Sequence, residues 1–83
     1  MVELPTYSQY KAQVDLLVER GELSVEDGII LLCVFRNHLE GNSTHVNYLM
    51  SATGLDWKRI NHRLNSLTMK GGIRKLDKSW YSL

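Results

Sequence analysis

The 83-residue chain has one cysteine, one proline and no long apolar run. Cys33 has no second cysteine to pair with, so an internal disulfide is excluded, and we expect a buried thiol. His38, His45 and His62 are not spaced as zinc ligands, so no metal site is predicted. The apolar run at residues 28–35 is too short to cross a bilayer, which predicts no membrane partner.

Motifs that carry chemistry are also missing. The chain has no phosphate-binding loop, no Ser-His-Asp or Cys-His grouping and no carboxylate pair at an obvious cleft. We therefore expect no enzyme activity, no catalytic residue and no cofactor. Glu3 and Pro5 interrupt any apolar segment at the N-terminus, so no signal peptide is expected. Without repeats or linkers, residues 1–83 are predicted to form one domain.

Charge is small in total but unevenly distributed. Residues 1–55 carry three Lys or Arg against seven Asp or Glu, whereas residues 56–83 carry seven against two. Such asymmetry is expected of a protein that meets an anionic partner on one side. An ordinary solvated polar face is the alternative for the same pattern.

Apolar spacing and capping residues predict four helices. Thr6 and Gln9 have capping-box spacing, and Ser24 and Asp56 are predicted N-caps. Ser43 or Thr44 is predicted to cap the third helix. The second helix is apolar around much of its circumference, so it should be the central helix of the core. The predicted helices span residues 6–19, 24–40, 44–53 and 56–69.

After Gly71-Gly72, two short strands are predicted near residues 73–76 and 80–83, joined by Asp77-Lys78-Ser79. This order resembles a winged helix-turn-helix domain, of the type found in small bacterial or phage transcriptional regulators. The resemblance covers residues 24–83 and leaves residues 1–22 as an extra N-terminal helix. It implies a mainly α fold with a small C-terminal β-hairpin. The residues that carry it are Leu49 to Asp56, Ile60, Leu64, Leu67, Gly72-Ile73 and Trp80 to Leu83.

The resemblance implies sequence-specific binding of double-stranded DNA, with transcriptional regulation as the role. The helix at 56–69 would enter the major groove and the hairpin at 73–83 would act as the wing. Arg and Lys suit guanine or phosphate, and Asn suits adenine. The expected location is cytoplasmic and nucleoid-associated. The predicted DNA-binding residues are Ser43, Thr44, Trp57, Lys58, Arg59, Asn61, His62, Arg63, Asn65, Arg74, Lys75 and Lys78.

Several alternatives stay open. The cations of the 56–69 helix could belong to an ordinary solvated face. Those of the hairpin could be edge-strand charges that discourage pairing with another sheet. Trp57 could cover the core, which is the preferred reading. Trp80 could be half-buried, or exposed at the wing and facing a partner or a sugar. The whole domain could be a protein–protein interaction module, because a fold does not fix a function. RNA binding is not excluded. The N-terminal helix could complete the core or form a homodimer, and we favour the dimer.

Overall fold

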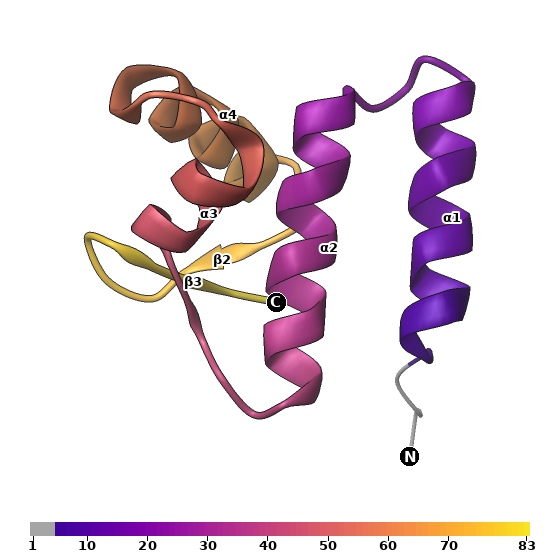
Figure 1. Cartoon of the computed structure of the whole chain (residues 1–83), viewed down its shortest axis with the longest axis horizontal. Coiled ribbons are helices and arrows are strands. Elements are labelled where there is room, and N and C mark those ends of the chain that lie inside the picture. The colour runs from indigo at the N-terminus through magenta and orange to yellow at the C-terminus, as the bar shows by residue number, and fades with distance from the viewer. Residues whose placement is uncertain (1–4) are drawn as a thin grey trace.

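The computed structural model describes residues 5–83, which contain four helices and three short strands (Figure 1). Residues 1–4 lie outside this range, as does the part of the predicted N-terminal extension and of the signal-peptide prediction that falls on them. None of the helices described is both long and apolar enough to span a bilayer. The elements are α1 (Tyr7–Glu19), α2 (Val25–Leu39), β1 (Thr44–His45), α3 (Val46–Thr53), α4 (Trp57–Met69), β2 (Arg74–Lys75) and β3 (Trp80–Ser82).

The fold is mainly helical with a small antiparallel sheet at the C-terminal end, as predicted. The sheet has three strands in the order β1-β3-β2, rather than the two strands of the predicted hairpin. The additional strand β1 pairs with β3, with Thr44 opposite Tyr81 and His45 opposite Trp80. The chain therefore enters the sheet once before α3 and returns to it after α4.

The predicted caps of α1, α2 and α4 are confirmed. Thr6 and Gln9 form the reciprocal capping box, and the Ser24 hydroxyl accepts a hydrogen bond from the Asp27 amide. The Asp56 carboxylate caps α4. The predicted cap of α3 is wrong: His45 occupies that position, and its Nδ1 accepts from the Asn47 amide at 3.0 Å.

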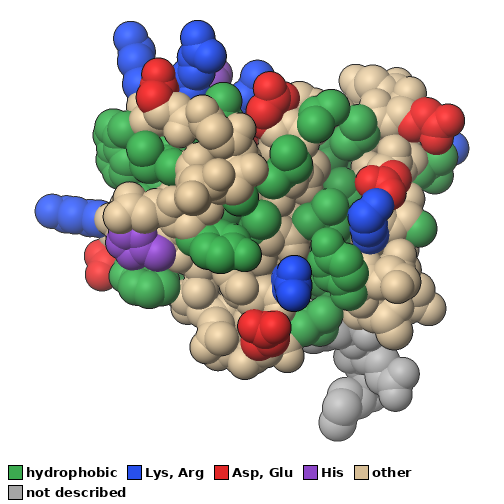
Figure 2. Space-filling model, in the orientation of Figure 1, with side chains coloured by type: hydrophobic (Ala, Val, Ile, Leu, Met, Phe, Trp, Pro, Cys, Tyr) green, Lys and Arg blue, Asp and Glu red, His purple; other side chains and the backbone are tan. Residues whose placement is uncertain are grey.

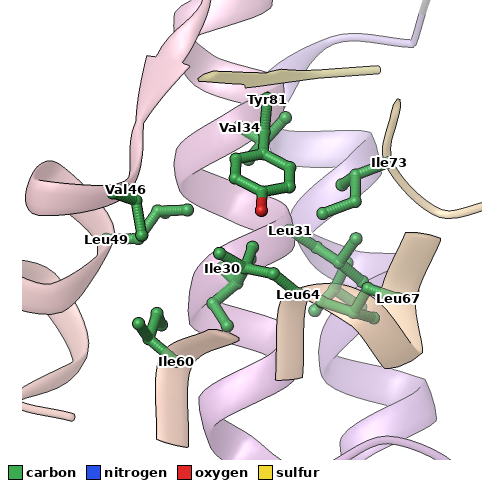
Figure 3. Close-up of a cluster of buried hydrophobic side chains, with 11 residues drawn as sticks. Ile30, Leu31, Val34, Val46, Leu49, Ile60, Leu64, Leu67, Ile73 and Tyr81 are labelled. Atoms are coloured by element: carbon green, nitrogen blue, oxygen red, sulfur yellow. The ribbon is translucent and has the colours of Figure 1, made fainter. Parts of the chain in front are cut away.

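Helix α2 lies between α1 on one side and the α3, α4 and sheet layer on the other, which confirms the prediction of a central helix (Figure 1). One face of α2 joins side chains from α3, α4 and β3, and Ile73 just before β2, in a single cluster (Figure 3). Because α4 contributes Ile60, Leu64 and Leu67 to this cluster, the position of α4 depends on it. The cluster contains Val14, Ile30, Leu31, Val34, Val46, Leu49, Ile60, Leu64, Leu67, Ile73 and Tyr81.

Helix α1 packs against α2 through part of its predicted apolar stripe. Val14 is buried in the core, and the Tyr10 ring stacks on Phe35 with centroids 4.0 Å apart. The close approach requires Gly28, since a Cβ there would lie 3.2 Å from a Val18 methyl group. The stripe is not buried throughout, because Tyr7 and Leu17 keep substantial exposure.

We expect Leu49→Ala to lower the free energy of unfolding by about 3 kcal/mol, because Leu49 is fully buried and the shorter side chain leaves a cavity. Leu16→Ala is the matched control: Leu16 is also helical but nearly half exposed, so its change should stay below about 1 kcal/mol. Urea denaturation followed by circular dichroism measures both. Equal losses in the two variants would contradict the core described here.

Candidate nucleic-acid interface

One face of α4 is fixed against the core and the other is left free. The Arg59 amide donates to Asp56 Oδ1 at 2.8 Å, which sets the start of the helix. Ile60, Leu64 and Leu67 are buried, as the sequence predicted. With 3.6 residues per turn, the positions between them must point outward.

The outward face of α4 is basic and rich in amides. Lys58, Arg59, His62 and Asn65 are exposed, and Asn61 is partly buried. Helix α4 itself carries no carboxylate. Figure 2 shows Lys and Arg side chains projecting from the upper edge of the molecule, where α4 lies. The face is a broad depression lined by Glu26, Leu55, Asp56, Lys58, Arg59, Asn61, His62, Arg63 and Asn65.

Arg63 lies at the edge of this face and turns toward α2. Its Nη1 is 3.8 Å from Asp27 Oδ2, and the Asp27 side chain is only 6% exposed. Asp27 Oδ1 has no hydrogen-bond partner among the described residues. Arg63 is therefore the nearest compensation for a buried negative charge. The Arg63 guanidinium therefore interacts with α2, and it is less available to bind a DNA phosphate than the sequence suggested.

Thr44 is removed from the predicted contact surface. Its side chain is 1% exposed, and its Oγ1 accepts a hydrogen bond from Asn37 Nδ2 at 2.9 Å. The residue pairs with β3 and is buried, so in this structure its hydroxyl is not at the surface where the predicted DNA contact would form. Ser43 precedes the strand and is partly buried.

The hairpin cations form a separate part of the surface. Arg74, Lys75 and Lys78 are all exposed, and none of them lines the depression over α4. Arg74 Nε donates to the Leu83 carbonyl at 2.8 Å, which holds this guanidinium along the sheet. Lys78 lies in the turn, where its amide donates to Asp77 Oδ1. The structure thus brings the α4 residues together but not the hairpin residues with them.

Both tryptophans are on the surface. Trp57 at the start of α4 is half exposed. The preferred interpretation, that this side chain covers the core, can therefore apply to at most half of it. Trp80 is 43% exposed and meets the His45 ring edge to face, with centroids 4.9 Å apart. Sequence reasoning left Trp80 open, and it did not connect this residue with His45, because β1 was not predicted.

Cys33 is partly buried in α2. Burial raises the pKa of its thiol, and the nearby Arg36 charge opposes that rise only in part. A raised pKa reduces the thiolate fraction at neutral pH, which makes the sulfur a poor nucleophile. Residues 5–83 contain no group of three or more His, Cys, Asp or Glu side chains placed to hold a metal ion.

Comparison with protein-family models, with curated proteins and with solved structures finds no match for this chain.

Asp27 is the residue at this site that sequence reasoning missed. In the sequence it stands in the first turn of α2, where a carboxylate complements the helix dipole. Such a role predicts an exposed side chain, whereas the structure buries it beside α4. No pattern within α2 indicates this burial, because the cause is the approach of a distant helix.

We expect Asp27 and Arg63 to be energetically coupled. Arg63→Met should lower the free energy of unfolding in the parent chain, where it leaves a buried carboxylate uncompensated, but much less in an Asp27→Asn background. The coupling should be about 1 kcal/mol, since Arg63 is partly solvated. Urea denaturation of the four chains measures it. Arg59→Met is the matched control, and a zero coupling energy would make the contact incidental.

Proposed function

We propose that the chain is a winged helix-turn-helix protein that binds double-stranded DNA sequence-specifically, with transcriptional regulation as its role. The observation that carries the proposal is the outward face of α4, which presents cations and amides without a carboxylate of its own helix. These groups match the chemistry of duplex DNA, where phosphates need positive charge and base edges need paired donors and acceptors.

The arrangement of elements supports the same proposal. The order α2, α3, glycine turn, α4 and then the hairpin of β2 and β3 is the order on which the resemblance to a winged domain rests. Gly54 takes a left-handed conformation, φ 73°, in the turn between α3 and α4. In this proposal α4 lies in the major groove and the turn between β2 and β3 is the wing.

Each side chain has a distinct role in the proposed complex. Lys58 and Arg59 would meet guanine edges or phosphates, while Asn61 and Asn65 would pair with adenine. His62, at the middle of the exposed face, would donate to a base or a phosphate. The hairpin cations would neutralise the flanking backbone. A cytoplasmic, nucleoid-associated location follows from this proposal.

We expect Lys58→Ala to weaken binding to a generic duplex and to reduce the salt dependence by about 0.9 in the slope of log K against log salt, which is the effect of one lost phosphate contact. Fluorescence anisotropy with a labelled duplex across a salt series measures it. Lys11→Ala is the matched control, because Lys11 lies on α1 and pairs with Asp15 at 2.7 Å.

A separate measurement is needed to test which residues of α4 recognise the DNA base sequence. Selection of binding sites from a random duplex pool should yield one motif for the parent chain, and Arg59→Ala should relax it at one or two positions. Identical motifs for both chains would remove Arg59 from base readout. Salt-independent binding, or no binding at low salt, would overturn the DNA proposal itself.

We further propose that the chain forms a homodimer through α1. This helix packs mainly on α2, at the edge of the molecule (Figure 1). It keeps apolar side chains at the surface, with Leu16 46% and Leu17 37% exposed. A second copy related by two-fold symmetry would cover them and would present two α4 helices to two half-sites.

The dimer predicts a mass twice that of the 9.6 kDa chain. Size-exclusion chromatography with light scattering at about 0.1 mM protein should detect it, and Leu16→Glu should return the monomer because it places a charge in the interface. Val25→Glu, at an exposed apolar position on α2, is the control. A monomeric parent chain at this concentration would exclude the dimer.

A second candidate function is a winged-helix protein–protein interaction module. The observation that favours it is a pair of half-exposed aromatic side chains, Tyr48 and Trp80, away from the basic face of α4. The proposed contacts of α4 with duplex DNA give these aromatics no role. They belong to a second concave surface of the molecule.

A further inference from the structure

A groove runs where the end of α2, the start of α3 and the strands β1 and β3 meet. It shares no lining residue with the depression over α4. None of the residues that line it is Lys, Arg, Asp or Glu, in a chain that is 23% charged. Its lining residues are Asn37, Gly41, Asn42, Ser43, His45, Tyr48 and Trp80.

The groove has aromatic walls that are held in place. Trp80 is 43% and Tyr48 50% exposed, so each offers part of a ring to solvent. The His45 ring stands at 82° to the Trp80 indole and fixes its orientation. His45 and Trp80 are opposite each other on paired strands, and Tyr48 lies on the first turn of α3. The rings are therefore positioned by backbone structure and need little ordering when a ligand binds.

The polar groups around these rings include several uncharged hydrogen-bond donors. His45 Nδ1 accepts from the Asn47 amide, which leaves the proton of the neutral ring on Nε2. The Trp80 indole N–H, the Tyr48 hydroxyl and the Asn42 amide add further donors. Asn37 gives one N–H to Thr44 and keeps a second. The groove thus combines flat apolar rings with donors and carries no formal charge.

We propose that this groove binds a proline-rich segment of a partner protein in the polyproline II conformation. Proline rings stack on exposed aromatic side chains, and a proline-rich backbone presents carbonyl acceptors without amide donors. The groove supplies the complementary set, because it has aromatic walls and neutral donors. Aromatic-lined grooves are one of the recurring ways in which proteins recognise such segments.

The absence of cations separates this occupant from an unpaired nucleobase. Sites for single-stranded nucleic acid combine stacking aromatics with positive charge along the backbone path. This groove has the aromatics without the charge, while the cations of α4 line a different surface. The proposal does not depend on DNA binding, since the groove shares Ser43 alone with the predicted DNA-binding residues and no lining residue with the depression over α4.

The experiment uses the Trp57→Phe variant of the chain. Trp80 is then the only tryptophan, so the fluorescence emission reports on the groove. Titration with blocked decaproline should change the Trp80 emission, and the change should saturate at a peptide concentration of about one millimolar. Tyr48→Ala in the same background should weaken binding about tenfold, as expected for truncation of an aromatic anchor. Tyr7→Ala is the matched control, because Tyr7 is an exposed tyrosine on α1, outside the groove.

The proposal is overturned by any of three results. The first is no saturable change with decaproline, in a sample that circular dichroism finds folded. The second is an equal response to a Gly-Ser peptide of the same length, which would mean that the rings do not select proline. The third is unchanged affinity in Tyr48→Ala. Saturation by deca-thymidylate but not by decaproline would assign the groove to unpaired bases instead.

Discussion

The structure depends on the burial of α2 from two sides. On one side Ile30, Leu31 and Val34 enter the common cluster with α3, α4 and the sheet. On the other, Phe35 stacks on Tyr10 of α1. Each fully buried side chain of this size contributes about 1.5–3 kcal/mol. No other helix described has as many buried residues, so α2 is the reference against which the remaining elements are placed.

The same packing decides which charges are available to a partner. By holding Ile60, Leu64 and Leu67 inward, α2 leaves Lys58 and Arg59 at the surface of α4. It also brings its own first turn next to α4, where Asp27 meets Arg63. A buried carboxylate with an unpartnered oxygen costs free energy, and a partly solvated arginine at 3.8 Å offsets only part of that cost. At this position, therefore, the positive charge of Arg63 interacts with a carboxylate of the protein itself and is less available to a partner.

Local features could be predicted from the sequence, and features that depend on distant contacts could not. The caps at Thr6, Ser24 and Asp56 are set within three or four residues, so their spacing was sufficient. Strand β1 has two residues and exists only because it pairs with β3. The burial of Thr44 and the capping by His45 follow from that pairing. The outward residues of α4 could be predicted from the helical period. The contact of Asp27 with Arg63 could not, because it depends on how α2 and α4 pack.

The near-neutral total charge is compatible with the proposed DNA-binding role because the excess of each sign lies on different elements. Among its charged Lys, Arg, Asp and Glu residues, helix α4 has cations only, whereas α1 and α2 together carry four carboxylates against Lys11 and Arg36. Such a charge dipole turns the basic face toward a polyanion during approach, although salt limits its reach to about 8 Å. The aromatic groove is neutral, so a proline-rich occupant would add no charge that competes for the α4 cations. The two surfaces can then act in one small domain without electrostatic interference.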